Sequence, residues 1–200
     1  MPKNYSNVTL KSYGNNFPEY AIGVDTQGTI IKGGTTVSGG LYASTADSSP
    51  VTGTVETSLI GSGQGSLSVP ANGFQVGDSF SFNMAGHLTS TNGDELTIKI
   101  QFNGVDELVI GPLSMPNISD LHWEADAFFT IRSLGASGSI MSSFRFTYEE
   151  DASDKFSGTA ITQASTLNTT TLNTLDVVAS WNTVTGVSIY SEIFNLRKIY

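Results

Sequence analysis

Hydrophobic and polar residues alternate along most of the chain after about residue 52, which is the period of a strand that buries one face. Five stripes have apolar residues at successive or nearly successive second positions. They are Phe80, Phe82, Met84 and Leu88; Leu96, Ile98, Ile100 and Phe102; Trp123, Ala125, Ala127, Phe129 and Ile131; Ile140, Phe144, Phe146 and Tyr148; and Leu175, Val177, Ala179 and Trp181. No stretch of ten or more residues has a convincing helical period, so strands are predicted throughout this region.

Turn residues divide this region into separate strands. Asn72-Gly73, Asn103-Gly104 and Gly186 are typical of tight turns. The predicted strands cover residues 54–60, 66–69, 79–89, 96–102, 107–113, 121–134, 140–149, 156–162, 174–181 and 187–200. Strands of this number and spacing indicate an all-β fold, either an antiparallel β-sandwich or a jelly roll.

The first fifty residues follow a different pattern. They are rich in Gly, Asn, Thr and Ser, and their only strand candidates are short ones near residues 20–24 and 29–32. A segment with so few apolar residues buries too little surface to fold alone. We therefore predict an irregular N-terminal arm over residues 1–50 and a head domain over residues 51–200.

The last predicted strand is apolar on both faces. Strict alternation would place the odd-numbered apolar residues on one face, namely Ile189, Ile193 and Ile199. It would place the even-numbered ones on the other face, namely Tyr190, Phe194, Leu196 and Tyr200. A strand with two apolar faces is expected inside a sheet, with its end held in place. One face would close the core and the other is a candidate subunit interface, and the pattern does not decide which is which.

Composition narrows the possible partners. Charged residues make up 14% of the chain and the formal net charge is −9, with no dense cluster of Lys and Arg, so nucleic acid is not an expected partner. There is no cysteine for a disulfide or thiolate site. No window is long and apolar enough for a transmembrane helix, and the N-terminus lacks a secretory signal. If the protein acts outside a cell, we expect it to leave by another route, such as lysis.

Few residues suggest a chemical site. The run Gly61-Ser-Gly-Gln-Gly65 lacks the third glycine and the helix of a dinucleotide-binding loop, so a flexible turn is the favoured interpretation. His87 and His122 could bind a metal only if they converged with a carboxylate; surface or hydrogen-bonded histidines are the preferred interpretation. We predict no catalytic residue, no metal site and no cofactor.

Carboxylates gather between residues 149 and 154. Hard oxygen ligands in this turn could hold calcium, but their spacing matches no standard calcium loop, so a solvated turn is favoured. A pair of carboxylates for glycoside hydrolysis is possible in principle, although no pair stands out.

Four segments carry a resemblance to a known family: residues 53–70, residues 77–80, Phe129-Thr-Ile-Arg-Ser-Leu-Gly135 and residues 189–200. Through them residues 51–200 resemble the heads of virion surface proteins from bacteriophages and large DNA viruses, which are trimeric single jelly rolls of tumour-necrosis-factor-like or complement-head-like type. The resemblance implies a single jelly roll, a homotrimer and a place on a virion, after synthesis in the host cytoplasm. The short arm suggests a subunit that docks on a major capsid or other virion protein.

The leading hypothesis is therefore a non-enzymatic capsid decoration, cement or spike subunit. An alternative is a tail-fibre or spike tip that binds a host receptor or surface glycan. A polysaccharide-degrading enzyme is the third and least favoured hypothesis.

Overall fold

The computed structural model describes residues 22–24, 30–32, 35–36, 40–151 and 155–200. The chain divides into two compact units, residues 1–39 and 40–200. In the first unit, β1 (Ile22–Val24), β2 (Ile30–Lys32) and β3 (Thr35–Thr36) form a small antiparallel sheet in that order. The remainder of the predicted arm up to residue 39 lies outside the described residues.

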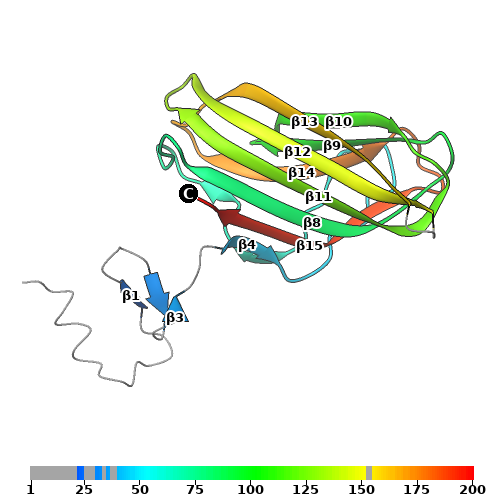
Figure 1. Cartoon of the computed structure of the whole chain (residues 1–200), viewed down its shortest axis with the longest axis horizontal. Coiled ribbons are helices and arrows are strands. Elements are labelled where there is room, and N and C mark those ends of the chain that lie inside the picture. Colours follow the sequence, from blue (N-terminus) through cyan, green and yellow to red (C-terminus); the bar gives the residue numbers. More distant parts are fainter. Residues whose placement is uncertain (1–21, 25–29, 33–34, 37–39, 152–154) are drawn as a thin grey trace, which may run out of the picture. The chain divides into compact units, whose positions relative to one another are not determined.

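The described residues of the second unit, 40–151 and 155–200, form twelve strands, and the described part of the chain contains no helix (Figure 1). The strands are β4 (Gly40–Ser44), β5 (Thr57–Ser58), β6 (Gly63–Gly65), β7 (Ser68–Val69), β8 (Ser79–Ser90), β9 (Glu95–Phe102), β10 (Val105–Ser114), β11 (Ile118–Ser133), β12 (Gly138–Asp151), β13 (Lys155–Leu167), β14 (Asn173–Trp181) and β15 (Ser188–Lys198).

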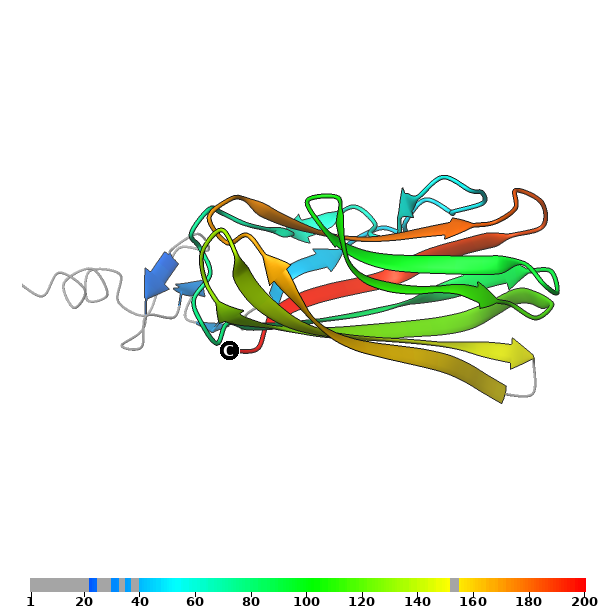
Figure 2. The same cartoon turned by 90° about the horizontal axis from the view of Figure 1, so that it is seen from above.

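These strands form two antiparallel layers that face each other (Figure 2). One layer has the order β13-β12-β11-β8-β15-β4-β6, and the other has the order β10-β9-β14-β5, with β7 also paired to β14. Successive strands change layer from β8 to β9, from β10 to β11, from β13 to β14 and from β14 to β15. This is the connectivity of a jelly roll, so the predicted all-β antiparallel sandwich is confirmed.

The hairpin of β12 and β13 is an addition to the eight-strand jelly roll. It extends the larger sheet beyond β11 and makes β13 the edge strand on that side. Residues 156–167 of β13 include no charged side chain and no proline. Their exposed positions outnumber their buried ones, as expected for an edge strand.

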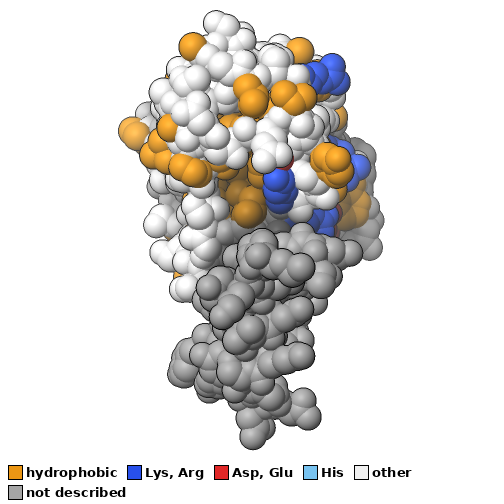
Figure 3. All heavy atoms as spheres, turned by 90° about the vertical axis from the view of Figure 1, so that its left-hand side faces the viewer, with side chains coloured by type: hydrophobic (Ala, Val, Ile, Leu, Met, Phe, Trp, Pro, Cys, Tyr) orange, Lys and Arg blue, Asp and Glu red, His pale blue; other side chains and the backbone are white. Residues whose placement is uncertain are grey.

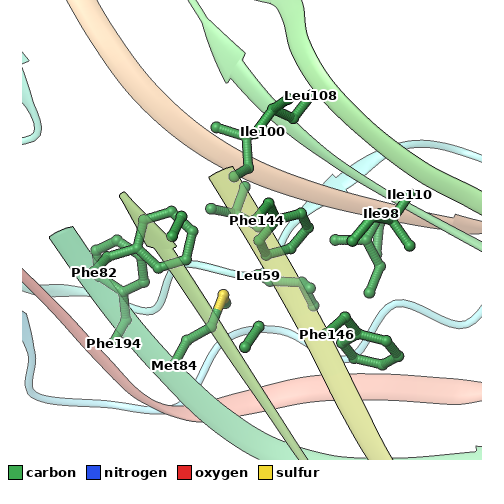
Figure 4. Close-up of a cluster of buried hydrophobic side chains, with 14 of the residues drawn as sticks. Leu59, Phe82, Met84, Ile98, Ile100, Leu108, Ile110, Phe144, Phe146 and Phe194 are labelled. Atoms are coloured by element: carbon green, nitrogen blue, oxygen red, sulfur yellow. The ribbon is translucent and has the colours of Figure 1, made fainter. Parts of the chain in front are cut away.

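The core lies between the layers. Figure 4 shows aromatic side chains of the larger sheet facing aliphatic side chains of the smaller one. Phe82 is central, with ring centroids of Phe194, Phe129 and Phe144 at 5.3, 6.0 and 6.1 Å. Members of the five predicted stripes are buried, apart from the half-buried Phe80 and Phe102. Their alternation therefore identified the inward faces correctly.

Two segments differ from the sequence-based expectation. Residues 40–50 do not belong to the arm, because β4 pairs with β15 and Val51 forms a bridge with Ile189, so the second unit begins at residue 40. Gly63–Gly65 is not a loose turn but the strand β6, paired with β4. A Cβ on Gly63 would lie 2.1 Å from the carbonyl oxygen of Ala43, so glycine permits this close pairing.

Candidate interaction surface

β15 lies in the interior of the larger sheet, between β8 and β4, as expected for a strand with two apolar faces. Its pairing with β8 shifts between Ser191 and Ile193, so Glu192 is an extra residue in a β-bulge. Before the bulge, Ile189 faces the core; after it, Phe194 and Leu196 do so.

The expected division of β15 into odd and even faces is therefore wrong. The extra residue at the bulge exchanges the two faces, which strict alternation cannot anticipate. Three of the seven predicted interface candidates are buried in the core of their own chain: Ile189, Phe194 and Leu196. The other four remain on the surface, with Tyr190 half-buried and Ile193, Ile199 and Tyr200 exposed.

The end of β15 is held by its backbone. The Ile199 N–H donates to the carbonyl oxygen of Ser79 at 2.7 Å, and the Ser79 N–H donates to the carbonyl oxygen of Tyr200 at 3.0 Å. Ile199 is 55% exposed and Tyr200 is 81% exposed. The prediction that this end is held in the sheet is confirmed for the backbone, while both side chains remain available to solvent.

Gly86 of β8 accommodates the bulge. A Cβ at this position would lie 2.0 Å from the carbonyl oxygen of Tyr190, so no larger residue fits here without displacing β15. The neighbouring Trp123 indole N–H donates to the carbonyl oxygens of His87 and Tyr190, both at 3.1 Å. Gly86 and Trp123 thus hold β15 against β8 next to the bulge, which determines the side chains of β15 that point outward.

Three rings form a row on the outer face of the larger sheet. Tyr190, His87 and His122 occupy paired positions on β15, β8 and β11, with centroid separations of 6.1 and 6.2 Å. His87 Nδ1 lies 3.2 Å from Asp120, and His122 Nε2 lies 3.3 Å from Glu124. The two histidine rings are therefore neighbours. The sequence could have predicted this only with knowledge of the register between β8 and β11.

Carboxylates surround the tyrosine of this row. The pKa of Tyr190 is raised by desolvation and further by the negative charges of Asp120, Glu192 and Asp47. This part of the outer face therefore favours neutral or positively charged groups.

The middle of the same face carries two exposed apolar side chains. Phe128 on β11 is 49% exposed and Ile193 on β15 is 51% exposed. Ser81 and Ser143 are paired with Phe128, and Ala85 is paired with Ile193. On the same face the Arg197 Nε–H donates to Ser81 Oγ at 2.9 Å, and Arg145 forms an ion pair with Asp126. The face thus offers apolar contact area at Phe128 and Ile193, with charged side chains beside it.

The outer face of the smaller sheet has a different character. Lys99 lies 2.5 Å from Glu56 and 2.9 Å from Asp106, and Gln101 donates to both carboxylates. Hydrogen bonds to Glu56 and Asp106 raise the pKa of Lys99. Burial opposes ionisation of Asp106, but hydrogen bonds from Lys99 and Gln101 outweigh it and lower its pKa. Lys99 thus bridges two carboxylates on this face.

One carboxylate is buried near the edge of the sandwich. Glu107 on β10 accepts hydrogen bonds from the hydroxyls of Ser142 and Ser165, both at 2.5 Å. These hydroxyls belong to β12 and β13, so Glu107 joins the added hairpin to the smaller sheet. This arrangement fits a structural role.

The described residues do not assemble a metal centre. Among them, no three His, Cys, Asp or Glu side chains are placed so that they could hold a metal ion. Residues 152–154 of the candidate calcium turn lie outside the described part. Glu149, which the structure places in β12, accepts a hydrogen bond from the backbone N–H of His122. Within the described chain, no helix is long and apolar enough to cross a membrane.

Comparison with known proteins adds no family. No protein-family model matches the chain, and a search of curated proteins finds no match. The resemblance to virion heads therefore remains a prediction, as do the trimer, the partners and the non-enzymatic role.

Proposed function

We propose that the chain is a non-enzymatic structural subunit that assembles with copies of itself, as a homotrimer, on the surface of a virion. Self-association is supported by the outer face of the larger sheet, where Phe128 and Ile193 expose apolar side chains. Ile199 and Tyr200 add apolar side chains at the end of β15.

The expected energies fit such a contact. Burying one large apolar side chain contributes about 1.5–3 kcal/mol. Phe128 and Ile193 from each subunit, repeated by symmetry, would offset part of the entropy lost on association. The virion setting rests on the resemblance of residues 51–200, and the arm is the proposed attachment to another virion protein.

Light scattering on the purified full chain tests the assembly. A trimer has a mass of about 64 kDa, three times the 21.2 kDa of one chain. The Phe128→Asp and Ile193→Asp variants should shift the mass toward one chain, because each buries an unpaired charge in the contact. Val184→Asp is the matched control, since Val184 is 70% exposed in a loop before β15. A monomeric parent protein would overturn the proposal.

Electron microscopy tests the setting separately. Gold-labelled antibodies against the chain should decorate intact virus particles whose genome encodes it. Particles without label, from a stock in which the protein is expressed, would contradict a virion location even if the trimer forms.

A further inference from the structure

The sandwich has an apolar cavity at the end where β15 finishes. Figure 3 views this end and shows hydrophobic side chains around a hollow beside basic side chains. The cavity has a volume of about 210 Å³. Both layers contribute to its walls, with Leu67, Phe80, Phe102, Phe129, Ile131 and Leu175 among the lining residues. It is thus a gap between the two sheets that core side chains leave unfilled.

A paired charge borders this cavity. Lys198 Nζ lies 2.5 Å from Asp78 Oδ1, and the Gln75 N–H donates to Asp78 Oδ2 at 2.8 Å. The Asp78 side chain is only 8% exposed, whereas that of Lys198 is 42% exposed. Lys198 Nζ also lies 6.0 Å from the ring centroid of Phe80. The cavity therefore combines apolar walls with an ion pair whose charges neutralise each other, and the polar side chains of Ser66, Ser68 and Asn173 complete the lining.

We propose that this cavity binds a small neutral amphiphile, with an apolar body and a single hydroxyl or amide head. A neutral head can accept from Lys198 and donate to Asp78. A carboxylate head would be repelled by the negative charge of Asp78, and an ammonium head would be repelled by the positive charge of Lys198. Such a combination of apolar walls and few polar groups is typical of ligand pockets.

The volume sets the size of the ligand. An apolar protein cavity of about 150 Å³ accommodates benzene, which has six non-hydrogen atoms. In proportion, 210 Å³ accommodates about eight non-hydrogen atoms. A seven-carbon alcohol has this size.

A series of linear alcohols tests both the site and its size. 1-Butanol to 1-decanol are titrated into the full chain, and methyl shifts are followed by NMR. The Kd should fall about fourfold for each added methylene, until the cavity is filled near 1-heptanol, and then stay level. Absence of saturable binding, or affinity that keeps rising through 1-decanol, would overturn the proposal.

The head group is tested at constant chain length. Heptanoate and heptylammonium should bind on the order of tenfold more weakly than 1-heptanol, because each opposes one charge of the pair. Asp78→Asn should reverse the order of heptanoate and 1-heptanol, since Lys198 then lacks its counterion. Tighter binding of heptanoate to the parent protein would refute the neutral head.

A blocking variant locates the site. Val69 on β7 lines the cavity, so Val69→Phe should weaken 1-heptanol binding more than tenfold. Val184→Phe makes the same change at a 70% exposed position and should leave the affinity unchanged. Thermal unfolding checks that both variants fold. Parent-like affinity in folded Val69→Phe would place the ligand elsewhere, and the Asp78→Asn reversal provides an independent test if that variant does not fold.

Discussion

Phe194 is the strongest test of the register of β15. Its side chain is fully buried, and its ring centroid lies 5.3 Å from that of Phe82 and 6.0 Å from that of Tyr42. Truncation of such a ring leaves a cavity and costs about 3–5 kcal/mol. Phe194→Ala should therefore remove a large part of the 5–15 kcal/mol typical of a domain, and lower the Tm by about 6–20 °C.

Two neighbours provide the comparison. Ile189→Ala should cost about 2–5 kcal/mol because Ile189 is fully buried, although it stands at an odd position. Ile193→Ala should change the free energy of unfolding by less than about 0.5 kcal/mol, because that side chain is half exposed. Without the bulge, Ile189 and Ile193 would share one face and behave alike.

Urea unfolding followed by tryptophan fluorescence measures these differences. Trp123 and Trp181 are both buried, so their emission should change on unfolding. All variants are compared at a protein concentration at which light scattering gives the mass of one chain, since association through Ile193 would stabilise the folded state. A cost above about 2 kcal/mol for Ile193→Ala, with a negligible cost for Ile189→Ala, would refute the bulge.

Three further predictions concern other parts of the fold. Gly86→Ala should yield misfolded or insoluble protein, because the added Cβ would lie 2.0 Å from a carbonyl oxygen of β15. The assay is the yield of soluble protein. Gly40→Ala is the control and should behave as the parent, since a Cβ at Gly40 would have no atom within 4 Å. Asp106→Asn should reduce stability at pH 7 by less than about 1 kcal/mol, since its carboxyl is 39% exposed. Because the pKa of Asp106 is lower in the folded state than in the unfolded state, its contribution to stability is present above the unfolded pKa of about 4 and should vanish as the pH falls through the lowered folded-state pKa. Urea unfolding of the parent and of Asp106→Asn from pH 7 to pH 2 measures this. A difference between their urea midpoints that stays constant over this range would contradict the prediction. Glu107→Gln should cost about 1–3 kcal/mol in urea unfolding, because one amide oxygen replaces two carboxylate oxygens that each accept a serine hydroxyl; an unchanged midpoint would show that the hydroxyls find other acceptors.

The inward faces of the long strands could be predicted from the sequence, because burial of one face requires alternation. Trp123 and Phe129, for example, are both buried as their stripe indicated. The assignment failed where a contact between distant residues intervenes. The bulge of β15 depends on Gly86, about a hundred residues earlier, which no local pattern connects to it.

The candidate surface was less predictable for the same reason. His87 and His122 become neighbours only through the register of β8 and β11. The exposure of Phe128 depends on which face of β11 the smaller sheet covers. The cavity beside Lys198 arises from imperfect filling between two sheets, and such filling depends on side-chain packing in three dimensions rather than on order along the chain.

The position of β15 has a consequence for biosynthesis. β4 and β8 leave the ribosome long before β15, yet β15 lies between them and joins them into one sheet. Until residues 188–198 emerge, one edge of β8 lacks the strand that pairs with it, and the larger sheet of the nascent chain is incomplete. Folding of the sandwich should therefore be completed only after β15 has emerged, and a chain truncated before β15 would expose the unpaired edges of β4 and β8 to chaperones or to other nascent chains.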